Sequence, residues 1–354
     1  MKTFGQQYFE KTAYVNFDNN ARMKQVFEGD LDIERLVLAI SAETGVSIEA
    51  ENTLIIFDEI QEVPKALTSL KYFHENAPQY AIVAAGSLLG VALHQGTSFP
   101  VGKVDFLDLY PLNFREFLCA MGEKQFVSML DSCDTQMVTV FKTKYIERLR
   151  EYYFVGGMPE VVKDFSEKKD YNRVRAIQKN LINYYQQDFS KHAEIKLVPR
   201  LNLVWNSIPM QLAKENKKYI YGQVREGSRA KDFELAIQWL LDCGLIHKVQ
   251  RIQKPDLPLK AYIDFDAFKL FLVDIGLLIA MTDLDAKVII EGNKIFTEFK
   301  GSLTEQYILQ QLISDVGVIP YYYSTQNSKG EIDFLVQGKT SVIPIEVKAE
   351  ENLK

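Results

Sequence analysis

Two adjacent acids, Asp58 and Glu59, directly follow an uninterrupted apolar run in the segment TLIIFDEIQ, residues 53–61. A short run rich in β-branched residues is typical of a strand that is buried on both faces of a parallel sheet. Ligands bind in the crevice at the carboxyl ends of such strands. There, Asp58 could hold Mg²⁺ directly or through water, and Glu59 could orient a water molecule for attack on a γ-phosphate. The alternative is an apolar strand that ends in a solvated turn.

A second set of acids lies near the C-terminus. The segment VIPIEVKA, residues 342–349, alternates like a strand, so Glu346 and Lys348 leave the same face of it. Asp333, in the preceding predicted strand, can share that face, and Glu305 lies in a predicted helix. These oxygen ligands suit Mg²⁺ or Mn²⁺, and such a metal ion with a lysine beside it could hydrolyse a phosphodiester. The alternative is a strand face whose acids are solvated or ion-paired.

The first acidic pair needs a sheet to position it, and the N-terminal segments predict one. The hydrophobic pattern predicts strands at residues 12–18, 53–57 and 80–85, helices at 31–41 and 63–78, and the end of a helix at 1–11. This order of strands and helices indicates a parallel sheet with right-handed crossovers.

A nucleotide-binding sheet of this kind should carry a phosphate-binding loop, GxxxxGK[ST], before its first helix. No such run occurs in the 354 residues. The loop supplies backbone N–H groups and a lysine for the β- and γ-phosphates. We therefore expect either a chain that begins just downstream of the loop or one that never had it. In both cases we expect weak ATP binding and impaired hydrolysis.

The runs at residues 53–90 and 98–118 resemble bacterial and archaeal AAA-type ATPases that carry a C-terminal domain of unknown function, DUF4143. The resemblance extends over nearly the whole chain. It implies ATP and Mg²⁺ as cofactors, with Asp58 and Glu59 as the Walker B acids and Ser87 at the sensor position. It also implies a charge-stabilising role for Lys103, at a position where arginine is usual and offers a different hydrogen-bonding geometry.

The middle of the chain reads as helices followed by a strand. Gly156 and Gly157 predict a helix-to-helix turn, because no lysine and Ser/Thr follow them at phosphate-loop spacing. Helical runs at 204–212 and 233–243 precede a strand-like run at 245–252. This order suggests a winged-helix module, which the resemblance also implies.

Residues 214–260 contain ten Lys/Arg against six Asp/Glu, a net charge of +4. Arg225, Arg229 and Lys231 cluster just before the second helix, where a winged helix would contact DNA phosphates. The alternative is a module that packs between domains, with its charges on a solvated face. His247 is predicted to be a half-buried strand residue and not a metal ligand.

The C-terminal acids carry a second resemblance. The pattern of Asp333 followed by Glu346 and Lys348 is similar to that of the PD-(D/E)xK nucleases. It implies Asp333 and Glu346 as metal ligands, Lys348 as the catalytic lysine and Glu305 as an auxiliary acid. The sequence ends just past the third predicted strand, so we expect this nuclease-like domain to be incomplete.

The composition argues against several other classes of protein. The net charge of −6 gives no overall indication of nucleic-acid binding. The three cysteines are widely spaced and predict neither a disulfide framework nor a zinc site. No apolar run reaches the roughly 18 residues of a membrane span, and the N-terminus lacks the apolar core of a signal peptide. We therefore predict a cytoplasmic protein that is not associated with a membrane.

The sequence thus predicts an α/β protein with four parts. These are a partial AAA core with a parallel sheet at 1–125, a helical lid or linker at 126–198, a winged-helix-like module at 199–262 and a nuclease-like domain at 263–354. The predicted function is ATP-coupled action on nucleic acid, with DNA, a partner protein or a second copy of the chain as binding partners. The alternative is a non-enzymatic interaction or regulatory protein in which both sites are vestigial.

Overall fold

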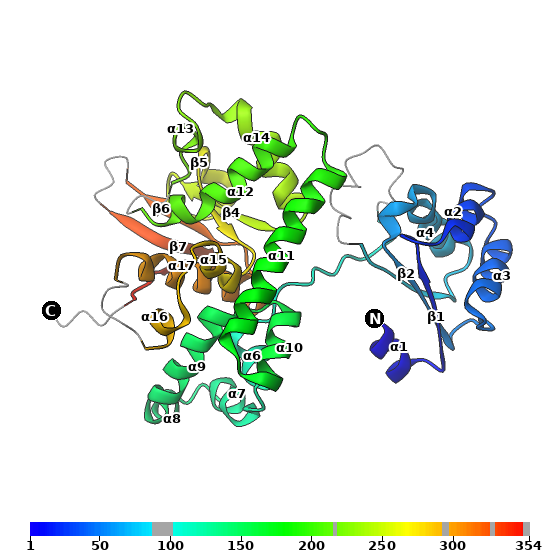
Figure 1. Cartoon of the computed structure of the whole chain (residues 1–354), viewed down its shortest axis with the longest axis horizontal. Coiled ribbons are helices and arrows are strands. Elements are labelled where there is room, and N and C mark those ends of the chain that lie inside the picture. Colours follow the sequence, from blue (N-terminus) through cyan, green and yellow to red (C-terminus); the bar gives the residue numbers. More distant parts are fainter. Residues whose placement is uncertain (87–101, 215–217, 292–296, 326–329, 350–354) are drawn as a thin grey trace. The chain divides into compact units, whose positions relative to one another are not determined.

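The computed structural model of the chain describes residues 1–86, 102–214, 218–291, 297–325 and 330–349. They form two compact units, Met1–Asp108 and Leu109–Lys354. Each unit contains one sheet with helices around it, so the protein is a mixed α/β protein (Figure 1).

A parallel sheet forms the centre of the N-terminal unit. Its strands are β1 (Lys11–Asn16), β2 (Thr53–Asp58) and β3 (Ala81–Ala84), in the order β1-β2-β3. Both strand pairs are parallel, which confirms the prediction from the sequence. β2 is the middle strand, and residues 53–57 of it are buried, as expected for a strand covered on both faces.

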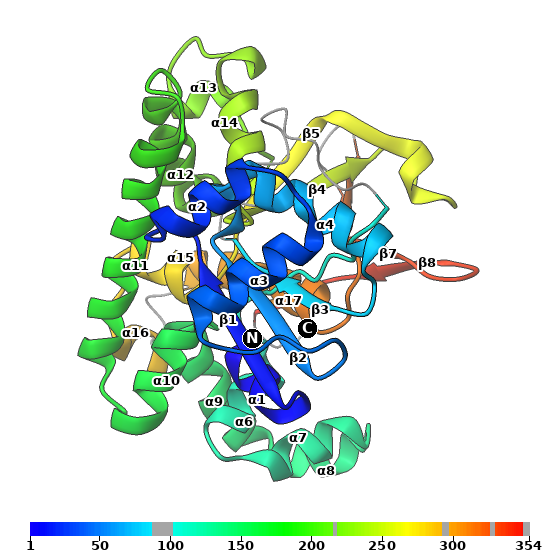
Figure 2. The same ribbon diagram turned by 90° about the vertical axis from the view of Figure 1, so that its right-hand side faces the viewer.

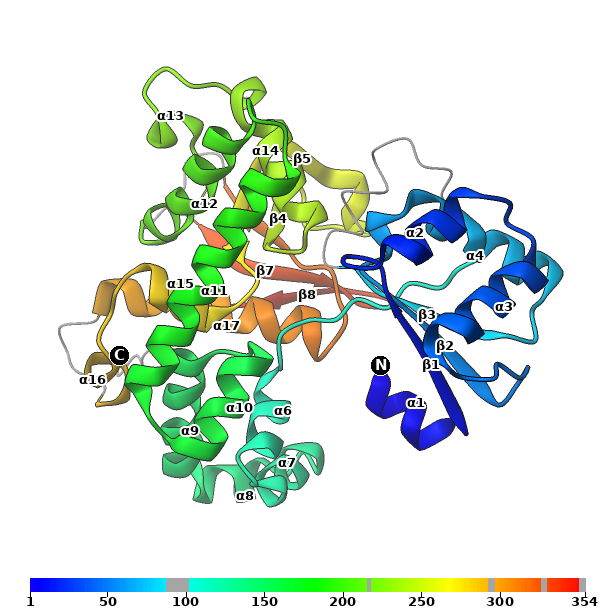
Figure 3. The same ribbon diagram turned by 45° about the vertical axis from the view of Figure 1, so that its right-hand side comes forward.

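Helices lie on both faces of this sheet. α1 (Lys2–Tyr8) packs on one face, where Gly5 closely approaches Thr12 and Leu54. The opposite face is covered by three helices, which Figure 3 shows on the side away from α1: α2 (Ala21–Glu28), α3 (Ile33–Thr44) and α4 (Pro64–Asn76). A short 3-10 helix, η1 (Ile60–Glu62), connects β2 to α4.

The alternation of side chains divides β1 and β2 between these two faces. Val15 lies opposite Phe57 in the parallel register, and both pack in the core with Phe27 of α2. Leu54 points to the face that α1 covers, and Asp58, four residues further along, points the same way. The first candidate acid therefore lies at the carboxyl end of the middle strand, on the α1 side.

The C-terminal unit begins with helices. The longest, α11, lies beside α10, α12 and α15 (Figure 1). The helices of this unit are α6 (Phe114–Ala120), α7 (Lys124–Asp131), α8 (Thr135–Val140), α9 (Lys142–Val155), α10 (Pro159–Lys168), α11 (Tyr171–His192), α12 (Val198–Leu212), α13 (Tyr221–Val224), α14 (Ala230–Asp242), α15 (Ile275–Met281), α16 (Ala286–Ile290) and α17 (Thr297–Ser314).

A five-stranded mixed sheet completes the unit, in the order β5-β4-β6-β7-β8. β4 and β6 are parallel, and the other neighbours are antiparallel; Figure 2 shows β7 and β8 running together. β5 begins at residue 263, so the segments on either side of the predicted boundary 262/263 share one hairpin. The strands are β4 (Ile246–Ile252), β5 (Ile263–Leu272), β6 (Tyr321–Ser324), β7 (Glu331–Gln337) and β8 (Val342–Ile345), with a 3-10 helix, η2 (Leu259–Tyr262), before β5.

A fully buried carboxylate, that of Asp274, joins the helices of this unit. It caps α15 by accepting a hydrogen bond from the Leu277 N–H at 3.0 Å. It also accepts hydrogen bonds from the Gly157 N–H at 2.6 Å and from Nε2 of Gln310, in α17, at 3.4 Å. Burial raises the pKa of Asp274, and the hydrogen bond from Gly157 partly offsets that effect. One side chain thus connects α15, α17 and the turn between α9 and α10.

Both glycines of that turn are required by close approaches, of Asp274 at Gly156 and of Leu112 at Gly157. Gly156 has φ +75°, and a Cβ there would collide with the Asp274 carboxylate. A Cβ at Gly157 would collide with the backbone of Leu112. The pair therefore forms a turn between two helices, as predicted from the sequence.

Replacing Asp274 with alanine should lower the free energy of unfolding by ~3 kcal/mol, because two buried N–H donors lose their acceptor. Asp285 offers a matched control, since it also caps a helix, α16, by accepting a hydrogen bond from the Lys287 N–H, but is exposed. Asp285→Ala should cost ~1 kcal/mol or less. Urea unfolding of both variants measures the difference, and equal losses would contradict the role given to Asp274.

His247 lies half-buried at the start of β4, as predicted, and its ring is 6.3 Å from that of Tyr110. Burial lowers the pKa of His247 to about 4. The unfolded chain therefore takes up this proton first as the pH falls below the ordinary histidine pKa of about 6.5.

Between pH 6.5 and 4.5, we expect the free energy of unfolding of the wild type to fall by about 2 kcal/mol more than that of His247→Gln. The reason is that only the wild type must keep this imidazole neutral while the unfolded chain protonates it. Urea unfolding at the two pH values measures the difference, and a parallel fall in both proteins would show that His247 makes no such contribution.

Candidate functional site

Asp58 and Glu59 lie at the carboxyl end of β2. Oδ2 of Asp58 accepts a hydrogen bond from the Tyr14 hydroxyl at 2.6 Å, and Oδ1 accepts from the Glu59 N–H at 3.1 Å. Glu59 has φ +51°, a left-handed conformation that is uncommon for residues other than glycine. Its Oε2 accepts a hydrogen bond from Nε2 of Gln61 at 2.6 Å. The two acids are therefore held in different directions by different partners.

Tyr14 and Lys2 belong to this site although the sequence analysis did not select them. The hydrogen bond to Asp58 raises the pKa of Tyr14. Nζ of Lys2, at the start of α1, lies 3.4 Å from the centroid of the Tyr14 ring. The register could have indicated Tyr14, since it lies two residues before Asn16, which is opposite Asp58 in the parallel pair. Lys2 could not be found in this way, because it comes from a separate helix.

The oxygen donors at this end of β2 fit Mg²⁺. Asp58 is half-buried, with a carboxylate and a phenol hydroxyl together, and Mg²⁺ prefers oxygen ligands from one or two carboxylates. Lys2 adds a positive charge beside them. These residues could therefore hold Mg²⁺ through Asp58, with the charge of Lys2 beside it.

The other two residues predicted to contact the nucleotide are Ser87 and Lys103. Ser87 lies outside the described residues. Nζ of Lys103 lies 3.4 Å from Oε1 of Glu75 in α4, and both side chains are partly exposed. Lys103 is thus ion-paired to a helix of the same unit.

The structure brings the C-terminal candidates together. β8 ends at Ile345, whereas the predicted strand extends to residue 349. Glu346 and Lys348 therefore lie just after the strand. Ile345 is opposite Phe334, and one step further along this antiparallel register Glu346 faces Asp333. Oδ2 of Asp333 accepts a hydrogen bond from the Val347 N–H at 2.7 Å. The shared face predicted from the alternation is therefore preserved beyond the end of the strand.

The charges of these groups act on one another. Burial raises the pKa of Asp333, and the neighbouring carboxylate of Glu305 raises it further. Lys348 is hydrogen-bonded to Glu346, which raises the pKa of Lys348. Both of those side chains are more than half exposed. Glu305, by contrast, is 5% exposed.

The donor set has the right chemistry for Mg²⁺ or Mn²⁺, since it consists of carboxylate oxygens. In the described part of the chain, however, no three His, Cys, Asp or Glu side chains are close enough together to hold a metal ion. The acids fit a divalent ion chemically, and a site would need their side chains to move closer to one another.

Lys269 of β5 is a further residue of this cluster that the sequence analysis missed. It is 1% exposed, donates a hydrogen bond to Glu331, and its Nζ lies 3.6 Å from Oε2 of Glu305. Residues 267–273 are apolar apart from Lys269, a pattern that is typical of a buried strand. A lysine in such a run is a signal in itself, because a lysine is rarely buried unless it is paired.

The basic residues before α14 are exposed, as contact with phosphates would require. Arg225, Arg229 and Lys231 are all exposed. Further along the same helix, the exposed surface includes Glu234 and Leu235, the latter 70% exposed. The positive charge is therefore confined to the N-terminal end of α14 and the loop before it.

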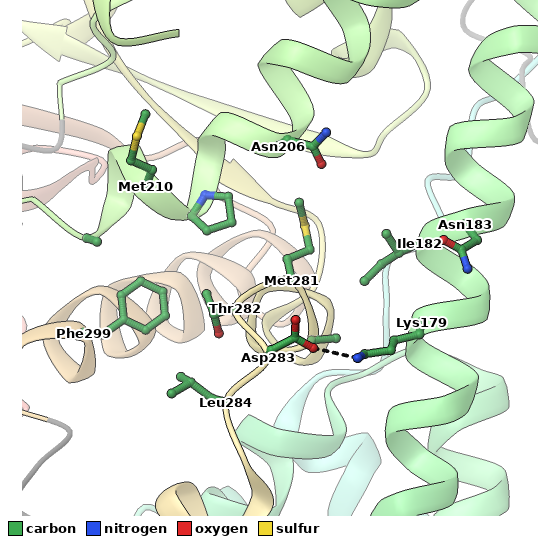
Figure 4. A pocket seen from close by; sticks show the side chains of 13 residues that line it. Lys179, Ile182, Asn183, Asn206, Met210, Met281, Thr282, Asp283, Leu284 and Phe299 are labelled. Carbon is green, nitrogen blue, oxygen red and sulfur yellow. Dashed lines mark ion pairs between the residues drawn. The ribbon is translucent and has the colours of Figure 1, made fainter.

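A pocket of about 960 Å³ opens among α11, α12, the end of α15 and α17 (Figure 4). Lys179 and Asp283 form an ion pair of 2.7 Å at this pocket. None of the predicted site residues lines it. The lining residues are Lys179, Ile182, Asn183, Asn206, Pro209, Met210, Ala213, Ala280, Met281, Thr282, Asp283, Leu284 and Phe299.

Among the helices that the structure describes, none is both long and apolar enough to cross a membrane.

Comparison with known proteins gives three family matches. Residues 1–118 match an AAA domain, residues 146–288 match a domain of unknown function (DUF8612), and residues 300–354 match another domain of unknown function (DUF4143). A search of curated proteins found no match. The first and last matches are the two domains that the resemblance implied. The chain therefore combines a segment that matches an AAA domain, residues 1–118, with a C-terminal segment that matches DUF4143, residues 300–354.

Proposed function

We propose that this protein binds ATP with Mg²⁺ at the carboxyl end of β2, hydrolyses it poorly, and couples nucleotide binding to action on nucleic acid. The observation that carries the proposal is the group of Asp58, Tyr14 and Lys2 at the end of the middle strand of a parallel sheet. In this group, the carboxylate of Asp58 is an oxygen ligand for the metal ion, and the Tyr14 hydroxyl orients that carboxylate. Lys2 supplies a positive charge that can contact phosphate.

The residues of this group have separate roles in the proposal. Asp58 holds Mg²⁺, and the Tyr14 hydrogen bond fixes the direction of its carboxylate. Lys2 contacts phosphate oxygens, and Glu59 orients the attacking water. Ser87 and Lys103 contribute the sensor and charge-stabilising roles that the resemblance implies. Bound Mg²⁺–ATP supplies a γ-phosphate polarised for in-line attack.

One feature of the site supports slow hydrolysis. Gln61 donates a hydrogen bond to Glu59 at 2.6 Å, so this carboxylate is already occupied by a protein donor. It is therefore less available to orient the attacking water.

For Mg²⁺–ATP we expect a dissociation constant of about 0.3 mM or weaker, measured by calorimetry. Lys2→Ala should weaken binding about fivefold or more, because it removes a charge-assisted contact to phosphate. Lys11→Ala is the matched control, since Lys11 begins β1 and pairs with Glu49 at 2.5 Å. A low micromolar affinity of the wild type, or equal affinities of wild type and Lys2→Ala, would contradict this account.

The proposed nucleic-acid function rests on residues 199–272. Three helices, α12, α13 and α14, precede the β4–β5 hairpin, and the Tyr219 N–H donates to the Phe268 carbonyl of β5 at 2.8 Å. This arrangement supports a winged-helix module. In it, Arg225, Arg229 and Lys231 would contact DNA phosphates.

The C-terminal acids support a nuclease-like domain. In this proposal Asp333 and Glu346 hold the metal ion, Glu305 is an auxiliary acid, and Lys348 stabilises the charge that develops on the phosphate. The proximity of Asp333, Glu346 and Lys348 supports these roles. The proposed division of the chain is the one predicted above, except that β5 belongs to the winged-helix hairpin.

With Mn²⁺, we expect the protein to nick supercoiled plasmid DNA, and Glu346→Ala and Lys348→Ala should each lose about 100-fold or more of that rate. Lys254→Ala is the matched control, because Lys254 forms an exposed pair with Asp256 at 2.8 Å. Gel assays of nicked product measure the rates. Unchanged nicking in both site variants would assign the activity to a contaminant.

A second candidate function is that of a regulatory or interaction protein in which both sites are vestigial. The observation that favours it is that both candidate sites are occupied by the protein's own groups. Gln61 binds Glu59, and Lys348 binds Glu346. Binding of a partner protein or a second copy would then be the function, and neither nucleotide nor Mn²⁺ would change it.

A further inference from the structure

Lys269 is the positive charge at the centre of the C-terminal acids. It lies in β5, outside the segment that matches DUF4143, and is 1% exposed. Its Nζ donates a hydrogen bond to Glu331 of β7 and lies 3.6 Å from Oε2 of Glu305 in α17. It also lies 4.8 Å from the ring centroid of Tyr322 in β6. Three elements that are distant in the sequence thus provide the surroundings of one ammonium group.

Glu305 depends on this ammonium for its charge balance. Its carboxylate is 5% exposed, and a buried carboxylate needs hydrogen-bond donors, a positive partner or a metal ion to be stable in its charged form. Lys269 is such a partner in this structure. The other two acids have different surroundings, because Asp333 accepts from the Val347 N–H and Glu346 lies at the exposed edge of the cluster.

We propose that Lys269 is a positioning residue that serves as the internal counter-cation of the acid cluster. It holds Glu305 and Glu331, so that a divalent ion is left with Asp333 and Glu346 as its protein ligands. The inference rests on the proposed metal site, and it changes the part played by Glu305 from metal contact to partner of Lys269.

This arrangement has two consequences for metal binding. Affinity for a hard divalent ion rises with the number of carboxylates that are free to bind it. Lys269 withholds two carboxylates and adds a positive charge nearby, so the cluster takes one ion and binds it weakly. Removal of Lys269 would release Glu305 and Glu331 to that ion.

Calorimetric titration of the full-length chain with MnCl₂ tests the proposal. Wild type, Glu305→Gln and Lys269→Arg should bind Mn²⁺ with affinities within about twofold of one another, because the ion does not contact Glu305 and arginine keeps the charge. Lys269→Met should bind about tenfold more tightly, since the number of available carboxylates increases. The double variant Lys269→Met/Glu305→Gln should bind with an affinity between those of Lys269→Met and the wild type, because Glu331 stays available while Glu305 does not.

Two results would overturn the proposal. One is a tenfold loss of affinity in Glu305→Gln alone, which would make Glu305 a metal ligand in the wild type. The other is an unchanged affinity in Lys269→Met.

The melting temperatures of the same variants without metal keep the proposal testable if Lys269→Met is too unstable to titrate. Loss of Lys269 leaves Glu305 buried without this ion pair, so Glu305→Gln should raise the melting temperature of Lys269→Met while it lowers that of the wild type. Strictly additive changes would overturn the pairing. If the wild type binds no Mn²⁺ but this coupling is found, the proposed nuclease site fails and the counter-cation role of Lys269 stands.

Discussion

The architecture of the C-terminal unit depends on a carboxylate that has no access to water. Asp274 takes part in helix capping, in the turn between α9 and α10, and in the contact with α17 through Gln310. A buried charge of this kind is tolerated only because several donors converge on it. The hydrogen bonds offset the cost of burying it, and because each donor belongs to a different element they also fix these elements relative to one another. Gly156 leaves room for the carboxylate of Asp274, and Gly157 leaves room for the backbone of Leu112 beside it.

The same unit places a second charged group in its interior, with the opposite sign. Lys269 lies among two carboxylates and an aromatic ring, and it joins β5 to β6, β7 and α17. The N-terminal unit has a polar contact between elements that involves three side chains. Tyr14 and Asp58 meet across neighbouring strands, and Lys2 reaches them from α1. In all three places a polar contact links elements whose hydrophobic packing alone would leave their relative positions less well defined.

The sequence predicted periodic features well and three-dimensional partners poorly. The parallel sheet followed from the apolar runs before Asp58 and around residues 80–85, because burial on both faces produces a recognisable pattern. The placement of Glu346 and Lys348 on one face was predicted from a period of two, and their side chains are hydrogen-bonded to each other. Tyr14 and Lys269 were missed for a common reason. Each acts through a neighbour that is more than 30 positions away, and only the strand register or the packing of a helix brings the two together.

The pairing of β4 with strands on both sides determines how the hairpin can behave mechanically. β5 holds it along one edge, and β6 holds it in parallel along the other at Arg251 and Ile252. A wing that ends freely in solvent can move toward a ligand, whereas this hairpin is hydrogen-bonded within a five-stranded sheet. Movement of the hairpin toward a ligand would therefore require the hydrogen bonds between β4 and β6 to break.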